Sequence, residues 1–248
     1  MVTIICGDTS YKDSEIIFFD KDGTLLNISM YVPVMKRRAE VLSENYDLPE
    51  ISLNEILELM GVDPDTGSII IGGSIHLPRI DNIKRTIDYL RKYSINASVE
   101  EISLLFDDVD DQVDFSTYIE PYSGVKELLE ELKKTDVKIV IFTHDSTLAA
   151  KKHLKNAGIG SYFDLVLGID PDSTYHIKPA PDMIQYACKV LEVNVNTAVV
   201  IGDQDKDMLA GKNAGVLGCI GVLTGKSVEK DLEHADIIIQ SVGEIEVK

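Results

Sequence analysis

The chain has 248 residues, 44% of them hydrophobic, and a formal net charge of −18 at pH 7. This length suits either one large domain or a core with a smaller inserted domain. The negative charge disfavours binding to nucleic acid backbones, and no apolar run reaches the roughly 20 residues that a membrane-spanning helix needs. We therefore expect a globular protein without a nucleic acid or membrane partner.

The first residues contain neither a basic segment nor an apolar run long enough for a signal peptide, so we expect a cytoplasmic protein. Cys6, Cys188 and Cys219 are widely spaced and form no C-x-x-C pattern. Neither a disulfide framework nor a zinc site is predicted, and we interpret all three as buried thiols.

The first strong structural signal is a strand that ends in carboxylates. An apolar run at residues 2–6 is interpreted as an added edge strand, and residues 15–20 are predicted to form the central strand of a sheet. Asp20 ends this strand, and Asp22 and Gly23 follow at once. Because ligands of open α/β sheets bind outside the carboxyl ends of the strands, both carboxylates are predicted to face a ligand. Gly23 lets the backbone approach that ligand closely.

Residues 28–118 contain no motif of this kind, and their helical periodicity predicts an inserted α-helical domain. The expected helices lie around residues 34–42, 53–60, 81–93 and 99–111. The glycine-rich, β-branched stretch 67–78 favours a loop or small hairpin. Residues 26–30 and 119–124 are interpreted as two hinge strands, and the acidic run 107–111 as a solvated helix end.

After residue 124 the pattern alternates between helix and strand. Helices are predicted at residues 125–134, 146–156 and 182–191, with a fourth ending near Gly215, and strands at residues 137–142, 164–167, 199–201, 219–222 and 237–239. Repeated βα units imply an α/β fold with a doubly wound parallel sheet.

Other polar groups follow these predicted strands. Thr143, His144 and Asp145 come directly after the strand at 137–142, and Gly202 and Asp203 end the strand at 199–201. Lys178 lies in a loop just before a proline, and Asp207 comes four residues after Asp203. Parallel strands bring their carboxyl ends to one edge of the sheet, so we expect these groups to form one site.

Four segments together carry a family resemblance: Asp20-x-Asp22-Gly23-Thr24, Thr143, Lys178, and Gly202-Asp203 with Asp207. In this order they resemble the signature motifs of the haloacid dehalogenase superfamily of phosphatases. The helical insertion resembles the cap of the phosphoglycolate phosphatase-like branch. This resemblance implies a Rossmann-like catalytic core at residues 1–27 and 119–248 and a helical cap domain at residues 28–118.

The resemblance also implies roles for the acidic residues. Asp20 would attack phosphorus and form an aspartyl-phosphate, and Asp22 would act as general acid and then as general base. A magnesium ion would bind at Asp20, Asp22, Asp203 and Asp207, with Asp22 contributing its backbone carbonyl.

The phosphoryl group would be bound by Gly23, Thr143, His144 and Lys178. Thr143 and the backbone N–H of His144 would donate hydrogen bonds to it, and Lys178 would neutralise the charge that develops on its oxygens. The His144 side chain is interpreted equally well as a substrate contact or as a solvent-facing group. The other four histidines, His76, His153, His176 and His234, have no partner that the sequence identifies.

The chain departs from the family pattern at two motif positions. Lys21 stands where many members have an apolar residue, and it is interpreted as a change in surface polarity only. His144 stands where many phosphatases have Asn, which leaves the substrate class open. In the cap, Lys36, Arg37 and Arg79 are hypothetical specificity contacts.

We therefore predict a magnesium-dependent phosphatase, a monomer or homodimer, that hydrolyses a small phosphorylated metabolite such as a phosphoglycolate-like compound or a sugar phosphate. The alternatives in the same branch are a phosphomutase similar to β-phosphoglucomutase, or a phosphonatase, which would need a cap lysine such as Lys36 or Lys84. A receiver-type phosphoacceptor switch is a more remote alternative. Asp22 would act as a built-in acid and base that hydrolyses the phosphoryl group of the switch.

Overall fold

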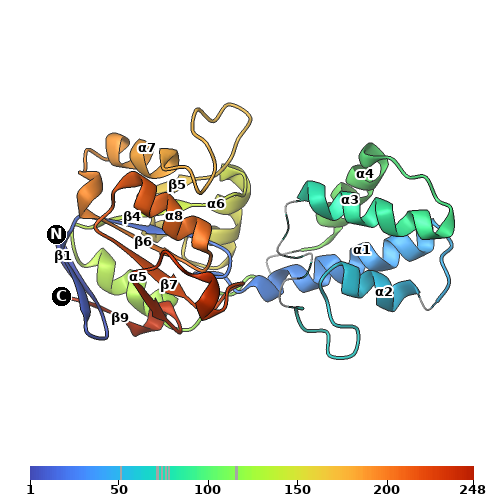
Figure 1. Ribbon diagram of the computed structural model, residues 1–248, viewed down its shortest axis with the longest axis horizontal. Helices are drawn as coiled ribbons and strands as arrows, with labels where there is room; N and C mark the ends of the chain where they lie inside the picture. The colour runs from blue at the N-terminus through green and yellow to red at the C-terminus, as the bar shows by residue number, and fades with distance from the viewer. Residues whose placement is uncertain (51, 71–72, 74, 76, 78, 115–116) are drawn as a thin grey trace. The chain divides into compact units, whose positions relative to one another are not determined.

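The computed structural model describes residues 1–248 except 51, 71–72, 74, 76, 78 and 115–116 (Figure 1). The chain divides into two compact units, one of residues 1–27 and 119–248 and the other of residues 28–118. Among the described residues, none of the helices combines the length and the apolar character that crossing a membrane requires.

The larger unit contains a sheet of six parallel strands in the order β5-β4-β3-β6-β7-β8. Its strands are β3 (Ile16–Phe19), β4 (Lys138–Phe142), β5 (Leu165–Leu167), β6 (Ala198–Gly202), β7 (Gly218–Val222) and β8 (Ile237–Ile239). The prediction that residues 15–20 form a central strand is confirmed, because β3 pairs with β4 on one side and β6 on the other. Every residue of β3 and β6 is buried, as expected for strands covered on both faces.

Four helices flank this sheet: α5 (Val125–Lys133), α6 (Thr147–Asn156), α7 (Asp182–Val190) and α8 (Asp205–Ala214). Apolar residues of α7 and α8 pack against β3, β4 and β6 in one hydrophobic cluster. The rings of Phe18 and Phe142 meet edge to face within it, with centroids 5.9 Å apart. The predicted α/β fold with a parallel sheet is confirmed.

A second, antiparallel sheet of the larger unit has the order β2-β1-β9, with β1 (Val2–Cys6), β2 (Thr9–Ser14) and β9 (Ile245–Val247). The interpretation of residues 2–6 as an edge strand was wrong, since β1 is the middle strand of this small sheet. Gly7, with a φ of +55°, turns the chain into β2. The other partner, β9, comes from the far end of the sequence, so no local signal identified the pairing.

The smaller unit is built from α1 (Val32–Asn45), α2 (Ser52–Leu59), α3 (Arg79–Leu90) and α4 (Val99–Gln112). The four helices predicted for the insertion are confirmed. Ser98 caps α4 by accepting from the N–H of Glu101, whose side chain accepts from the N–H of Ser98 in return. Buried residues from all four helices, among them Leu42, Ile56 and Phe106, form a separate hydrophobic cluster.

The two predicted hinge strands are not present. A single isolated bridge, between Leu26 and Pro121, joins residues 26–30 to residues 119–124, and Ile28–Tyr31 is a 3-10 helix. The N–H of Asn27 donates to the Glu120 carbonyl and the N–H of Tyr122 donates to the Leu25 carbonyl, both at 2.9 Å, so the two segments pair over this single bridge. In the stretch 67–78, Ile69 forms a bridge with Val62, while residues 71–72, 74, 76 and 78 lie outside the described residues.

The acidic run 107–111 is not only a solvated helix end. Asp110 receives ion pairs from Arg38 at 2.6 Å and from Arg79 at 2.6 Å, and Asp107 pairs with Arg79 at 2.6 Å. The guanidinium of Arg38 also lies 4.4 Å from the centre of the Phe106 ring. The run therefore joins α4 to α1 and α3, and the charge of Arg79 is already paired within the unit.

Candidate active site

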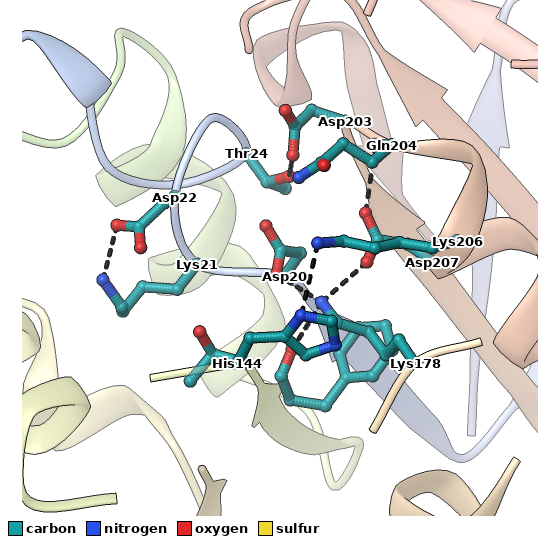
Figure 2. A network of polar contacts seen from close by, with 12 residues as sticks. Asp20, Lys21, Asp22, Thr24, His144, Lys178, Asp203, Gln204, Lys206 and Asp207 are labelled. Atoms are coloured by element: carbon teal, nitrogen blue, oxygen red, sulfur yellow. Dashed lines mark hydrogen bonds and ion pairs between the residues drawn. The ribbon is translucent and has the colours of Figure 1, made fainter. Parts of the chain in front are cut away.

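Three neighbouring strands deliver polar residues to one edge of the six-stranded sheet (Figure 2). Asp20 follows β3, Thr143 follows β4, and Asp203 follows β6. All three are buried, with at most 5% of each residue exposed. The structure thus brings together groups that lie 60 to 183 residues apart in the sequence.

A group of three carboxylates lies at the centre of this edge. Oxygens of Asp20, Asp203 and Asp207 lie within 4.8 Å of one another. Burial, together with the neighbouring charges of Asp20 and Asp207, raises the pKa of Asp203 to about 8. Like-charged carboxylates this close are unfavourable in a buried place unless a cation joins them.

Local backbone structure holds two of these carboxylates in place. Asp207 lies in the first turn of α8, where its Oδ2 accepts from the N–H of Gln204 at 3.0 Å. The Oδ2 of Asp203 accepts from the N–H of Lys226 at 2.8 Å, and its Oδ1 accepts from the Thr24 hydroxyl at 3.4 Å. Their orientation is therefore set by the protein rather than by a ligand.

Gly23 passes close to the same carboxylate. Its φ is +91°, and a Cβ at this position would lie 2.5 Å from Oδ2 of Asp203. Its carbonyl accepts from the Thr224 hydroxyl at 2.6 Å. Both the backbone conformation and the space require glycine.

Lys178 supplies the positive charge beside these acids. Its Nζ lies 2.5 Å from Oδ1 of Asp20 and 2.6 Å from Oδ1 of Asp207, and it donates to the Phe142 carbonyl at 3.1 Å. Burial alone would lower the pKa of Lys178, but the carboxylates of Asp20 and Asp207 outweigh burial and raise this pKa above its ordinary value. Burial acts to raise the pKa of Asp20, but Lys178 outweighs this effect and lowers it.

The donor set fits a magnesium ion. Mg²⁺ prefers oxygen ligands and is usually held by one or two protein carboxylates together with waters and substrate phosphate. Asp20, Asp203 and Asp207 offer such oxygens, and Lys178 compensates only part of their charge. The Asp22 carboxylate does not belong to this group, because it points toward Lys21 (Figure 2).

Thr143 and His144 lie on the side of the site formed by β4. Thr143 is 3% exposed, and its Oγ1 accepts from the N–H of Asp145 at 3.3 Å. The Nδ1 of His144 lies 3.3 Å from Nζ of Lys206. Burial, followed by the charges of Lys178 and Lys206, lowers the pKa of His144 to about 3. A neutral imidazole therefore accepts a hydrogen bond from Lys206 at neutral pH.

Lys206 is a site residue that the sequence analysis missed. It lies in the first turn of α8 between two residues of the recognised motif, and its amino group reaches toward Asp20 and Lys178 (Figure 2). Burial and the charge of Lys178 lower its pKa. Its place one residue before Asp207 was a usable signal, because the first turn of this helix starts at the site.

Lys21 is not a surface residue, so the earlier interpretation was wrong. It is 0% exposed, forms an ion pair with Asp22, and lies 3.0 Å from Oδ2 of Asp145. Its Nζ is also 3.2 Å from Nδ1 of His153. Burial alone would lower the pKa of Lys21, but the carboxylates of Asp22 and Asp145 outweigh burial and raise this pKa.

Other histidines also have partners that the sequence did not reveal. Nδ1 of His176 lies 2.6 Å from Asp182, and Nδ1 of His234 lies 2.8 Å from Asp205. Both pairs lie at helix N-termini, where Asp182 and Asp205 begin α7 and α8. His76 lies outside the described residues.

Comparison with known proteins decides the family. The family model of the haloacid dehalogenase-like hydrolases matches residues 15–215, which is most of the chain. The chain belongs to this family. The match spans the strand-end motifs around Asp20, Thr143 and Asp203, and it makes this protein an enzyme of the hydrolase class.

Individual relatives of this haloacid dehalogenase-like hydrolase have phosphatase names. It is 26% identical to a phosphoglycolate phosphatase from Neisseria meningitidis, over 93% of this chain and 92% of that protein. It is 34% identical to pyrophosphatase PpaX from Halalkalibacterium halodurans, over only 40% of this chain and 45% of that one.

Solved structures agree in fold. A predicted phosphoglycolate phosphatase from Haemophilus somnus 129pt matches with a TM-score of 0.67 at 22% identity, covering 96% of this chain and 97% of that one. A protein provisionally named as a beta-phosphoglucomutase from Thermotoga maritima matches with a TM-score of 0.69 at 23% identity, covering 93% and 95%. These matches show the same fold over at least 93% of the chain.

Proposed function

We propose that the protein is a magnesium-dependent phosphatase that hydrolyses a small phosphorylated metabolite through an aspartyl-phosphate on Asp20. The observation that carries the proposal is the contact between Lys178 and Asp20 beside two further carboxylates, at 2.5 Å between Nζ and Oδ1. Lys178 lowers the pKa of Asp20, so this carboxylate is ionised and ready to act as a nucleophile.

In the first step an oxygen of Asp20 forms a bond to phosphorus, and the bond between phosphorus and the leaving oxygen breaks. Lys178 and the Thr143 hydroxyl bind the phosphoryl oxygens, and the ammonium offsets the charge that builds up on them. Asp20, Asp203 and Asp207 would hold magnesium, which would draw charge from the phosphoryl group and offset the repulsion between these acids.

Asp22 gives its proton to the leaving oxygen and then removes a proton from the water that hydrolyses the aspartyl-phosphate. Burial raises its pKa, an effect that Asp145 adds to and Lys21 opposes. A raised pKa allows a carboxyl group to be protonated when it must act as an acid. Lys206, which lies in α8 and contacts His144, would add a further hydrogen-bond donor to the phosphoryl oxygens.

The phosphoglycolate phosphatase relative, which matches over nearly the full chain, favours a small phosphate ester with a second anionic group. The cationic side chain of Lys206 is a suitable partner for such a group, because it lies beside the site without a carboxylate partner of its own in the described contacts. We propose phosphoglycolate-like esters as the first substrates to test, with sugar phosphates next.

The test is phosphate release from a panel of esters, with and without Mg²⁺, by the wild type and by Asp20→Asn. We expect metal-dependent release that falls at least about 10³-fold in the variant, because the nucleophile is lost. Asp88→Asn is the matched control, because Asp88 is an exposed residue of α3 that pairs only with Arg91 among the described ion pairs. Release by Asp20→Asn at the control rate would reject the mechanism, and a lasting phosphorylated protein with no release would favour a mutase or a switch.

A further inference from the structure

Lys21 is one of two fully or nearly fully buried lysines among the described residues, and the other, Lys178, belongs to the phosphoryl site. Burying an ammonium group costs on the order of several kcal/mol of hydration free energy, as it does for any ion. Close partners must replace the lost water to offset this cost. The partners of Lys21 therefore indicate what the residue is for.

The Lys21 ammonium has three partners: it forms hydrogen bonds with Asp22 and His153 and an ion pair with Asp145. The partner atoms are a carboxylate oxygen of Asp22, Oδ2 of Asp145 at 3.0 Å, and Nδ1 of His153 at 3.2 Å. Asp145 lies next to the His153 ring as well, with 3.6 Å between Oδ2 and Nδ1. Two of the partners thus come from the β4 side of the sheet, and the third is the predicted acid and base.

Asp145 and His153 are themselves held in place by the fold. The N–H of Asp145 donates to Oγ1 of Thr143, and its carbonyl accepts from the N–H of Ile169 at 2.7 Å. His153 belongs to α6, and only 12% of its side chain is exposed. The ammonium group of Lys21 is therefore held by the segment after β4 and by α6, and neither contact involves Asp22.

The Asp22 carboxylate is turned away from Asp20 and toward Lys21 (Figure 2). A short side chain such as Asp has two rotatable bonds, and a carboxylate free to rotate would point at the leaving oxygen only part of the time. Holding it from a buried anchor removes this freedom, and a proton transfer that depends on geometry becomes more efficient.

We propose that Lys21 is a positioning residue: anchored by Asp145 and His153, it fixes the orientation of the Asp22 carboxylate and thereby sets the efficiency of proton transfer to the leaving oxygen. This inference rests on the proposed function, in which Asp22 is the general acid. The proton moves from the Asp22 carboxyl to the ester oxygen as the bond from phosphorus to that oxygen breaks and the bond from Asp20 to phosphorus forms.

A comparison of two leaving groups isolates this role. An alkoxide is strongly basic and needs a proton as it leaves, whereas 4-nitrophenolate leaves without one. The ratio kcat/KM reports only the steps up to the first irreversible one, here formation of the phosphorylated enzyme. A variant with a misplaced Asp22 should therefore lose kcat/KM for an alkyl phosphate far more than for 4-nitrophenyl phosphate.

The decisive variant is Lys21→Met, which removes the ammonium and keeps a side chain of similar length. With Mg²⁺ present, we expect kcat/KM for the best alkyl ester to fall at least about tenfold more than that for 4-nitrophenyl phosphate, within the range that general acid catalysis supplies. In the Asp22→Asn background, Lys21→Met should add no further selective loss, because both changes act on one proton transfer. Lys212→Met is the matched control, since Lys212 pairs with Asp236 outside this group of residues.

Equal losses for the two esters in Lys21→Met, or a selective loss that persists in the Asp22→Asn background, would overturn the inference. If Lys21→Met does not fold, Asp145→Asn tests the same anchor at a residue that is 31% exposed, and a selective loss is again expected. If Asp22→Asn itself shows no selective loss, the proposed acid role of Asp22 fails. If Asp22→Asn shows the selective loss but Lys21→Met and Asp145→Asn do not, the positioning role of Lys21 fails and the acid role of Asp22 stands.

Discussion

At the residue scale, His153 is expected to make the stability of the protein depend on pH. Burial, followed by the charge of Lys21, lowers its pKa to about 4 from an ordinary value near 6.5. Between these two values the unfolded chain binds a proton that the folded protein does not bind. The free energy of unfolding should therefore fall as the pH falls through this window.

The measurement is urea unfolding of the wild type and His153→Gln at pH 7 and pH 4.5. We expect the wild type to lose about 2 kcal/mol more than the variant over this interval, because Gln has no proton to bind. Carboxylates titrate in both proteins and cancel in the difference. Equal losses would mean that the imidazole is protonated in the folded state.

Individual residues also separate what the sequence could predict from what it could not. Asp20, Asp203 and Lys178 were predictable, because each lies in a motif at a strand end or beside a proline. The burial of Lys21 was not, since nothing in its neighbours along the chain distinguishes a buried lysine from an exposed one. Its anchor His153 lies 132 positions away.

At the scale of elements, the short strand β9 is expected to contribute to the stability of the larger unit. It pairs with β1, and the backbones of Thr3 and Lys248 exchange two hydrogen bonds of 2.7 and 3.0 Å. Ile245 is also largely buried. Removing residues 245–248 takes away these contacts and leaves β1 as an exposed edge.

We expect this truncation to lower the free energy of unfolding by about 2–4 kcal/mol, from one buried aliphatic side chain and several backbone hydrogen bonds. Urea unfolding measures the loss, and light scattering detects association through the exposed β1 edge. Lys248→Ala is the control, because it keeps the backbone bonds. A truncated protein as stable as this control would show that β9 contributes nothing.

Elements also differ in how well the sequence predicted them. The strands and helices between residues 125 and 239 were predicted almost to the residue, because each has a clear apolar pattern and a polar end, whereas β9 was not predicted. The hinge strands were wrong, since the two segments meet at a single bridge between Leu26 and Pro121 and Ile28–Tyr31 forms a 3-10 helix. Propensity is a local property, and pairing is not.

At the scale of the whole molecule, the two hydrophobic clusters are expected to respond separately to mutation. Phe106 is fully buried in the cluster of residues 28–118, and none of the described residues belongs both to that cluster and to the one around β3 and β6. Phe106→Ala should cost about 3–5 kcal/mol, as other large-to-small core changes do. The effect should be confined to the smaller unit.

Hydrogen exchange followed by mass spectrometry tests this expectation. Peptides from α1 to α4 should exchange faster in Phe106→Ala, while those from β3, β4 and β6 keep their wild-type rates. Phe18→Ala, in the other cluster, is the matched counterpart and should give the reverse pattern. Faster exchange throughout the chain in Phe106→Ala would show that the two units unfold as one.

The sequence by itself determined the α/β core, the helical insertion and the strand-end positions of Asp20, Thr143 and Asp203, because hydrophobic periodicity and strand-end motifs are local properties of the chain. Only the tertiary structure decided the three-stranded sheet of β1, β2 and β9, the contact of Lys206 with His144, and the anchoring of Lys21 by Asp145 and His153. The physical reason is that burial and charge pairing depend on which distant segments meet. That information resides in the packing of the chain as a whole.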